Sequence, residues 1–261
     1  CSSDLKKIVI KTKWIINILV NIIKMLMLPT NNNNQLISIE GNIGSGKSTL
    51  LANLKEHYKN NSNVVFLKEP VDEWEQIKDK DGLTMLQKFY ADQELYSFPF
   101  QMMAYISRLA ILRKTLKENK NCVLITERSL YTDKLVFAKM LFEQGKIEDV
   151  NYQIYLHWFD EFASDCPVNN IIYVKTSPQK CYERIHKRAR QGEEVIPLAY
   201  LESCSAYHNN FLSDNADSKV AIQCPKLVLD GDNDIFENKN ILEDWISQID
   251  RLVTSNDKKN N

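Results

Sequence analysis

The sequence predicts an α/β protein built on a parallel sheet of five strands, with helices on both faces. Five short apolar runs, each of three or four residues, are spaced along the chain. Segments with helical periodicity separate these runs. The first run leads directly into a glycine-rich phosphate-binding pattern, which in α/β proteins follows a strand and opens a helix.

The expected strands are residues 36–39, 64–67, 123–126, 171–174 and 227–229. The expected helices are residues 48–58, 100–117, 130–142, 152–163, 178–189, 197–212 and 235–252. Alternation favours parallel pairing, because parallel neighbours need a crossover long enough to hold a helix. Ligands in such folds bind beyond the carboxyl ends of the strands, so polar residues that follow a strand are the first candidates for a site.

After the first strand, the sequence GNIGSGKST fits the P-loop pattern G-x-x-x-x-G-K-[ST]. Its glycines let successive backbone N–H groups turn toward phosphate oxygens, and the following helix adds its positive end. Lys47 is expected to reach the β- and γ-phosphates, and Ser48 to contact Mg²⁺. The predicted nucleotide-binding residues are Gly41, Asn42, Ile43, Gly44, Ser45, Gly46, Lys47, Ser48 and Thr49.

Acidic residues follow the second and third strands. Glu69 could be a general base for a substrate hydroxyl, and Trp74 could pack against a flat ring. The alternative is an acidic loop with a structural tryptophan. Glu127 stands where a P-loop enzyme needs a second carboxylate for Mg²⁺, and Arg128 could hold a phosphate or orient the base. The alternative there is a salt-bridged strand end.

The helix expected after the fourth strand contains Arg184 and Arg188, which share a face, and Arg190 follows. Three guanidiniums could close over a triphosphate as a lid, whereas the alternative is a solvated basic helix. Gln101 lies in an aromatic stretch and could hydrogen-bond a base edge through its amide.

Composition limits the other classes of function. The 261 residues carry a net charge of −1, so no overall basic field favours nucleic acid as a partner. The six cysteines form no C-x-x-C pair, so neither a zinc site nor a redox pair is indicated.

The apolar run within residues 14–28 is short and interrupted by polar residues, so no stable membrane association is expected. We expect one domain at 36–254, a flexible or targeting tail at 1–35 and a disordered tail at 255–261. The expected location is cytoplasmic, or mitochondrial if residues 1–30 are a transit peptide.

Five segments occur in a specific order: GNIGSGKST, EPVDEW, SFPFQMMAYISR, ERSLYTD and RIHKRARQGEEVIPLAYLE. With them the chain resembles the deoxyribonucleoside kinase family, which includes deoxycytidine and deoxyguanosine kinases, over residues 36–250. The resemblance implies a P-loop kinase fold with an arginine-rich lid. It also implies Mg²⁺ with ATP as phosphoryl donor, a deoxynucleoside as acceptor of the phosphoryl group on its 5′-hydroxyl, and a homodimer joined through the helices at 100–117 and 130–142.

The resemblance assigns catalysis to Lys47, Glu69 and Arg128, and metal binding to Ser48 and Glu127. Tyr90 and Glu193 would hydrogen-bond the 3′-hydroxyl of the sugar. The implied donor-binding residues outside the P-loop are Arg184, Arg188, Arg190 and Asp230, the last in a loop at 230–236 that would approach the donor base. The implied nucleoside-binding residues are Glu69, Trp74, Tyr90, Gln101, Ala104, Arg108, Arg128, Asp133, Phe137 and Glu193.

Ala104, Arg108 and Asp133 stand where the family discriminates between bases. An arginine and an aspartate here go with deoxycytidine or purine deoxynucleosides, so little thymidine activity is expected. The segment between Trp74 and Tyr90 is shorter than in the animal deoxycytidine and deoxyguanosine kinases. Two alternatives remain: a nucleoside monophosphate kinase of the thymidylate kinase type, and a non-catalytic relative with a structural role.

Overall fold

The computed structural model describes residues 33–163, 165–190, 192–213, 224–236 and 238–254. Its centre is a sheet of five strands, all parallel, in the order β2-β3-β1-β4-β5. The strands are β1 (Gln35–Glu40), β2 (Val64–Leu67), β3 (Val123–Glu127), β4 (Asn170–Lys175) and β5 (Lys226–Asp230). The predicted α/β class, the strand number and the parallel pairing are therefore confirmed.

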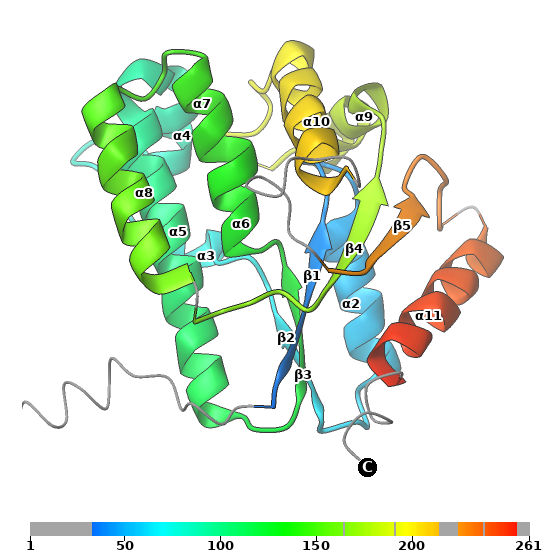
Figure 1. The fold of residues 1–261 in the computed structure, drawn as a ribbon. Coiled ribbons are helices and arrows are strands. Elements are labelled where there is room, and N and C mark those ends of the chain that lie inside the picture. The colour runs from blue at the N-terminus through cyan, green and yellow to red at the C-terminus, as the bar shows by residue number, and fades with distance from the viewer. Residues whose placement is uncertain (1–32, 164, 191, 214–223, 237, 255–261) are drawn as a thin grey trace, which may run out of the picture.

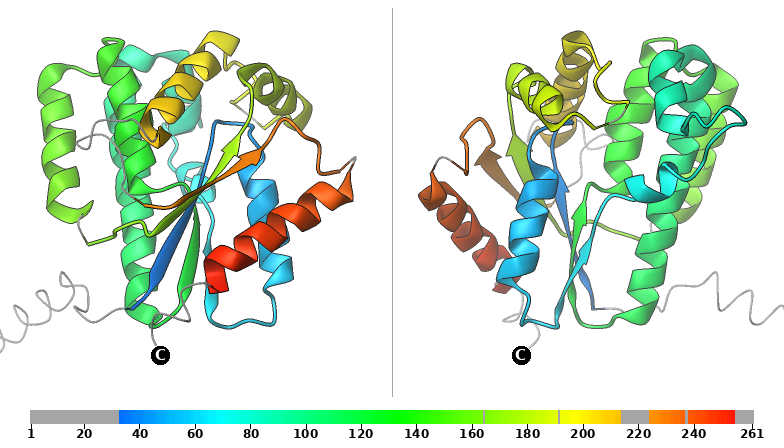
Figure 2. Two further views of the ribbon diagram at one scale, coloured as in Figure 1. Left: turned by 45° about the vertical axis from the view of Figure 1, so that its right-hand side comes forward. Right: turned by 180° about the vertical axis from the view of Figure 1, so that it is seen from behind.

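Helices cover both faces of the sheet because its strands are apolar on both sides. On one face, Ile37, Ile39 and their strand neighbours pack against α2 (Lys47–His57) and α11 (Lys239–Thr254). On the other face, Leu36 and Leu124 pack against α5 (Gln93–Glu118) and α8 (Asp149–Ala163). Figure 1 shows these two groups of helices on opposite sides of the strands, and Figure 2 shows the same layers from two further directions.

The structure differs from the prediction just before residue 100, where one helix begins earlier than expected and an unexpected helix precedes it. Helix α5 begins at Gln93 and continues through Pro99, with the Asp92 carboxylate accepting a hydrogen bond from the amide of Leu95 at 3.1 Å. A helix that was not predicted, α4 (Met85–Ala91), precedes it. Its start is fixed by a capping box, in which the Thr84 hydroxyl and the Gln87 side chain each bond the other's backbone amide.

The predicted helix at 130–142 consists of three pieces. They are α6 (Leu130–Thr132), a π-helical turn η1 (Asp133–Ala138) and α7 (Lys139–Glu143). A π-turn inside a helix often occurs at a functional site, and this one places two predicted site residues in one turn. The last predicted helix begins at Lys239 rather than at 235, so that residues 231–236 form a loop.

A third apolar cluster lies beyond the carboxyl ends of the strands and forms the walls of the site. It joins residues of α4, α5 and α7 to residues of α9 (Pro178–Arg188) and α10 (Leu198–Leu212). The short helix α3 (Val71–Trp74) completes this layer. None of the helices in the described ranges is long and apolar enough to span a bilayer. The predicted tails fall outside the described residues except at 33–35, where Gln35 already belongs to β1.

Candidate active site

A cavity of about 390 Å³ opens at the carboxyl ends of β1, β2 and β3. Its walls come from the P-loop, α4, α5, η1, the loop at 231–236, and the lid, which consists of the last turns of α9 with Arg190 and Glu193 after it. Every site residue predicted from sequence lines this cavity except Gly41, Asn42, Arg108 and Asp230. Its volume is within the range of small-ligand sites.

The P-loop is held in shape by glycines with left-handed backbone angles. Gly44 has φ +79°, and a Cβ atom there would lie 2.6 Å from the carbonyl oxygen of Cys181 in α9. Lys47 is buried, and its Nζ donates to the backbone oxygen of Asn42 at 2.6 Å. Burial, followed by the nearby Arg128 charge, lowers the pKa of Lys47 to about 8. This lysine therefore sits inside the loop that its motif predicts.

Three of the four predicted residues that do not line the cavity contact the backbone around it. A Cβ atom on Gly41 would lie 2.6 Å from a backbone oxygen of β4. The Asn42 amide donates to the carbonyl of Leu201 at 2.8 Å and thereby ties the P-loop to α10. Asp230 accepts a hydrogen bond from the amide of Asp232. The cavity is lined instead by its loop neighbours Gly231, Asn233, Asp234, Ile235 and Phe236.

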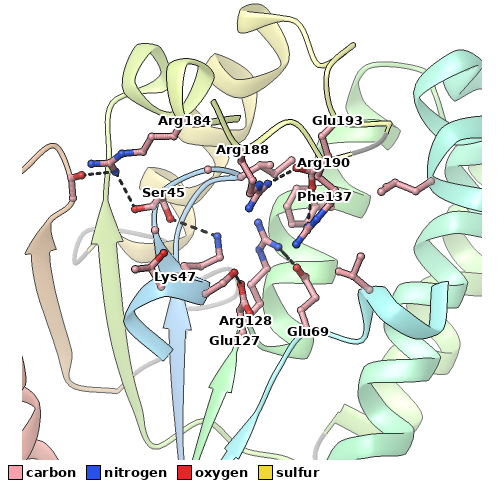
Figure 3. Close-up of a pocket in the computed structure, with 18 of the residues that line it drawn as sticks. Ser45, Lys47, Glu69, Glu127, Arg128, Phe137, Arg184, Arg188, Arg190 and Glu193 are labelled. Carbon is pink, nitrogen blue, oxygen red and sulfur yellow. Dashed lines mark hydrogen bonds and ion pairs between the residues drawn. The ribbon is translucent and has the colours of Figure 1, made fainter. Parts of the chain in front are cut away.

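Glu69 follows β2 and lies between two guanidiniums. Nη1 of Arg128 donates to both carboxylate oxygens at 2.8 Å, and Nη2 of Arg108 donates to Oε1 at 2.8 Å. Burial by itself would raise the pKa of Glu69. The charges of Arg128 and Arg108, with Lys47, outweigh burial and bring this pKa down to about 2. Glu69 is therefore a carboxylate at neutral pH, facing the P-loop across the cavity (Figure 3).

Arg128 occupies a strained backbone position directly after β3. Its φ is +64°, which is uncommon outside glycine. Two hydrogen bonds impose this conformation: the Arg128 amide donates to the carbonyl of Ile39, and its carbonyl accepts from the Thr126 hydroxyl, both at 2.9 Å. Within the described residues, Nε and Nη2 of Arg128 are buried without a hydrogen-bond partner. Arg128 lines the cavity beside Glu69, so these two donors are candidates for a contact with a ligand.

Arg108 connects three groups although it does not line the cavity. Its Nε donates to Asp133 at 2.9 Å, its Nη1 to the carbonyl of Glu127 at 2.7 Å, and its Nη2 to Glu69. Arg108 and Asp133, both expected at the base-discriminating positions, thus form an ion pair in the structure. Asp133 lines the cavity, so Arg108 fixes the carboxylate that a ligand meets.

Ser48 and Glu127 form the pair predicted for a divalent cation. The Ser48 hydroxyl donates to Oε1 of Glu127 at 2.5 Å, between the start of α2 and the end of β3. No group of three or more His, Cys, Asp or Glu side chains suited to a metal occurs in the described part of the chain. A hydroxyl and one carboxylate beside a phosphate loop fit Mg²⁺, which is usually bound by one or two carboxylates together with substrate phosphates.

Aromatic rings form the wall opposite the P-loop. Trp74 donates from Nε1 to the Ser107 hydroxyl at 2.8 Å and meets Phe100 edge to face. Phe100 in turn stacks on Phe89, with ring centroids 4.6 Å apart. The lining residues that the sequence prediction did not include are Val71, Leu86, Phe89, Phe100, Lys187, Tyr200 and Trp245. The capping box at Thr84 was the available signal for the helix that supplies two of them.

The lid arginines have different partners. Arg184 donates to the backbone carbonyls of Gly231 at 2.8 Å, Asn233 at 3.3 Å and Ser45 at 3.4 Å. Arg188 and Arg190 both pair with the carboxylate of Glu193 (Figure 3). The structure thus brings the three predicted arginines to one rim of the cavity.

A P-loop that shares an aromatic-walled cavity with an arginine-held carboxylate defines a phosphotransferase with a small-molecule acceptor. Residues 37–254 match the model of the deoxynucleoside kinase family. The chain belongs to this family, as its motifs predicted, and it is an ATP-dependent nucleoside kinase. The alternative of a thymidylate kinase type is not favoured.

Individual relatives agree with the family assignment. The chain is 35% identical over 243 residues to deoxycytidine kinase 2 of Gallus gallus, covering 84% of this chain and 90% of that protein. It is 31% identical over 226 residues to the mitochondrial thymidine kinase 2 of Homo sapiens, with coverages of 86% and 80%. It is 32% identical over 233 residues to the mitochondrial deoxyguanosine kinase of Xenopus laevis, with coverages of 81% and 86%.

Proposed function

We propose that the protein transfers the γ-phosphoryl group of ATP to the 5′-hydroxyl of deoxyadenosine, deoxyguanosine or deoxycytidine, and that thymidine is a poor substrate. The observation that carries this proposal is the Asp133 carboxylate on the cavity wall, held by Arg108 through Nε at 2.9 Å and Nη2 at 3.4 Å.

Base recognition follows from the hydrogen-bonding capacity of this pair. A carboxylate accepts hydrogen bonds from an exocyclic amino group, and a guanidinium donates to ring or carbonyl acceptors. Adenine and cytosine present an amino group on the edge where thymine presents a carbonyl oxygen and a methyl group. Guanine carries its amino group on C2 and would turn that edge toward Asp133, whereas thymine has no amino group on either edge. Thymine would therefore place a carbonyl oxygen against the Asp133 carboxylate, and two acceptors cannot form a hydrogen bond. Gln101, buried on the cavity wall, is our candidate for a further contact with the base.

Glu69 is our candidate for the general base. In its carboxylate form it can take the proton of the 5′-hydroxyl as that oxygen attacks the γ-phosphorus. Arg128 orients this carboxylate through two hydrogen bonds, and its remaining N–H groups suit an oxygen of the phosphoryl group in transfer. One guanidinium would then position both the base and the phosphoryl group in transfer.

The donor triphosphate would lie in the P-loop, where Lys47 and the backbone amides neutralise its charge. Arg184, Arg188 and Arg190 would approach it from the lid. Ser48 and Glu127 would hold Mg²⁺, which when bound neutralises phosphate charge. These assignments require only groups that line one cavity.

The sugar would be recognised by Tyr90 and Glu193, which both line the cavity. Burial and then the charge of Glu193 raise the pKa of Tyr90, so that its hydroxyl stays protonated and can donate. The 3′-hydroxyl can accept from this tyrosine and donate to the carboxylate.

We further propose a homodimer formed through α5 and α8. Ile106 on α5 and Trp158 on α8 are 51% and 45% exposed, and the Tyr105 hydroxyl bonds the Trp158 carbonyl at 2.9 Å. Val150 and Ile154 extend this exposed apolar surface along α8. The segment 130–142, which was expected to contribute, has no exposed large apolar residue, so α8 takes its place in the proposal.

Two experiments test these proposals. Steady-state rates with the four deoxynucleosides measure the base preference, and a higher kcat/KM for thymidine than for the other three would overturn it. Light scattering after gel filtration measures the mass in solution. Twice the chain mass is expected, with Ile106→Glu reducing it to one chain, whereas a monomeric unmodified protein would refute the dimer.

A further inference from the structure

Glu193 makes contacts that its proposed role toward the sugar does not require. Its side chain is 7% exposed, and its two oxygens pair with two different lid arginines. Arg188 donates to Oε2, and Arg190 donates to Oε1 at 3.1 Å. One carboxylate therefore has both of its oxygens occupied by guanidiniums of the lid.

The third lid arginine is held in a different way. The hydrogen bonds of Arg184 go to backbone carbonyls of the P-loop and of the loop at 231–236. A neutral carbonyl leaves the positive charge of the guanidinium uncompensated, whereas a carboxylate neutralises one positive charge. Of the three arginines, Arg188 and Arg190 are thus the pair whose charge is partly cancelled before any phosphate arrives.

The position of Glu193 places it between the two substrate sites. Tyr90 is on α4, at the aromatic end of the cavity, and the charge of Glu193 acts on its hydroxyl. The lid backbone also passes close to the same helix, since a Cβ atom at Gly192 would lie 3.1 Å from the Gln87 side chain. Arg188, Arg190 and Glu193 lie together at the rim in Figure 3, with Glu69 on the same side of the cavity.

We propose that Glu193 is also a positioning residue for the lid: it holds Arg188 and Arg190 in the free enzyme, and a bound nucleoside releases them to the donor phosphates. This inference rests on the proposed function, because the 3′-hydroxyl of the nucleoside is the group that competes for the carboxylate. A hydroxyl that donates to Glu193 takes an acceptor site from the arginines. Their N–H groups then have the phosphate oxygens as better partners.

Two consequences follow from this competition. Donor and nucleoside bind with positive coupling, in which each raises the affinity for the other by the same factor. Without nucleoside, the donor must displace Glu193 from both arginines. A substitution that removes the negative charge of Glu193 therefore improves donor binding when no nucleoside is present.

The test measures binding of the β,γ-imido analogue of ATP with Mg²⁺ by calorimetry, with and without a deoxynucleoside. The unmodified chain is compared with Glu193→Gln. For the unmodified protein, we expect the nucleoside to lower the Kd of the analogue about 5- to 150-fold. For Glu193→Gln, we expect the Kd without nucleoside to fall about three- to tenfold, since the ion pairs to two partly exposed arginines no longer compete. We also expect the effect of the nucleoside to shrink.

Glu194→Gln is the matched control, because this exposed neighbour loses the same charge without an ion pair to either arginine. An equal fall in Kd for both variants would overturn the proposal, since only net charge would then be responsible. An unchanged or higher Kd for Glu193→Gln would overturn it as well. Should Glu193→Gln melt early, Glu193→Asp provides the second test, since its shorter side chain cannot keep both contacts and should also tighten donor binding.

The proposed function is measured separately in the same preparation. Phosphorylation of a deoxynucleoside by the unmodified protein, with no change in donor affinity for Glu193→Gln, would refute the role in the lid and leave the kinase assignment intact. Absence of phosphorylation would refute the proposed function itself, and with it the release of the lid by a nucleoside.

Discussion

The substitution Glu69→Gln removes the proposed general base while keeping the shape of the side chain. The carboxylate accepts three hydrogen bonds of 2.8 Å from Arg128 and Arg108, and a glutamine amide keeps one acceptor oxygen for them. A positioned general base contributes about 10²- to 10⁴-fold to rate, which corresponds to about 3–5 kcal/mol of activation free energy. We therefore expect kcat to fall by that factor and the Kd of the nucleoside to change little.

The same substitution also affects stability, because two buried guanidiniums lose their shared counter-charge. Removing one partner of a buried ion pair typically costs about 3–5 kcal/mol of unfolding free energy. The assay is therefore single-turnover phosphorylation at saturating ATP-Mg²⁺, run well below a melting temperature measured for each variant. Nucleoside binding is measured by calorimetry in the same buffer.

Glu69→Asp serves as the control that keeps the charge and withdraws the carboxylate. We expect it to be more stable than Glu69→Gln and still slow, because the base no longer reaches the 5′-hydroxyl. A folded Glu69→Gln variant with a kcat within about threefold of the unmodified protein would remove Glu69 from catalysis.

Three further predictions concern base preference, acid stability and the P-loop. Arg108→Met combined with Asp133→Ala should raise the kcat/KM of thymidine relative to deoxycytidine by about tenfold or more, and no relative gain would refute the specificity assignment. His208 is buried, and burial lowers its pKa from an ordinary 6.5 to about 3. Its neutral form therefore belongs to the stable fold at neutral pH, and stability is lost as the pH falls from about 6.5 toward 3. His208→Phe should make the unfolding free energy fall less steeply over that range, and equal slopes for the two proteins would contradict this. Gly44→Ala should lower unfolding free energy by about 1–3 kcal/mol because of its positive φ and its 2.6 Å approach to the Cys181 carbonyl, and an unchanged urea midpoint would contradict that packing.

The parts of the site that sequence could predict are those encoded by local patterns. The P-loop is contiguous, so its glycines and Lys47 follow from one motif. Glu69 and Glu127 follow from the rule that ligands bind where parallel strands end, although this rule gives no distance between them. The strand order β2-β3-β1-β4-β5 was not predicted, because alternation of strands and helices specifies parallel pairing but not which strands are neighbours.

Other features depend on tertiary contacts that spacing along the chain does not encode. Arg108 meets Glu69, Asp133 and the carbonyl of Glu127, which come from three separate segments. The π-turn at Asp133–Ala138 interrupts an apolar pattern that reads as one regular helix. Phe89 lies on a helix whose capping box was readable from Thr84, yet its stacking on Phe100 depends on how α4 packs against α5.

The central claim is that this protein phosphorylates a deoxynucleoside rather than a nucleotide. It is tested most directly by steady-state phosphorylation with ATP-Mg²⁺ of deoxyadenosine, deoxyguanosine, deoxycytidine and thymidine, with the matching monophosphates as parallel substrates. We predict turnover of at least one of the first three nucleosides to its 5′-monophosphate, with little turnover of thymidine. Turnover of a monophosphate alone, or of no substrate in the series, would contradict the account.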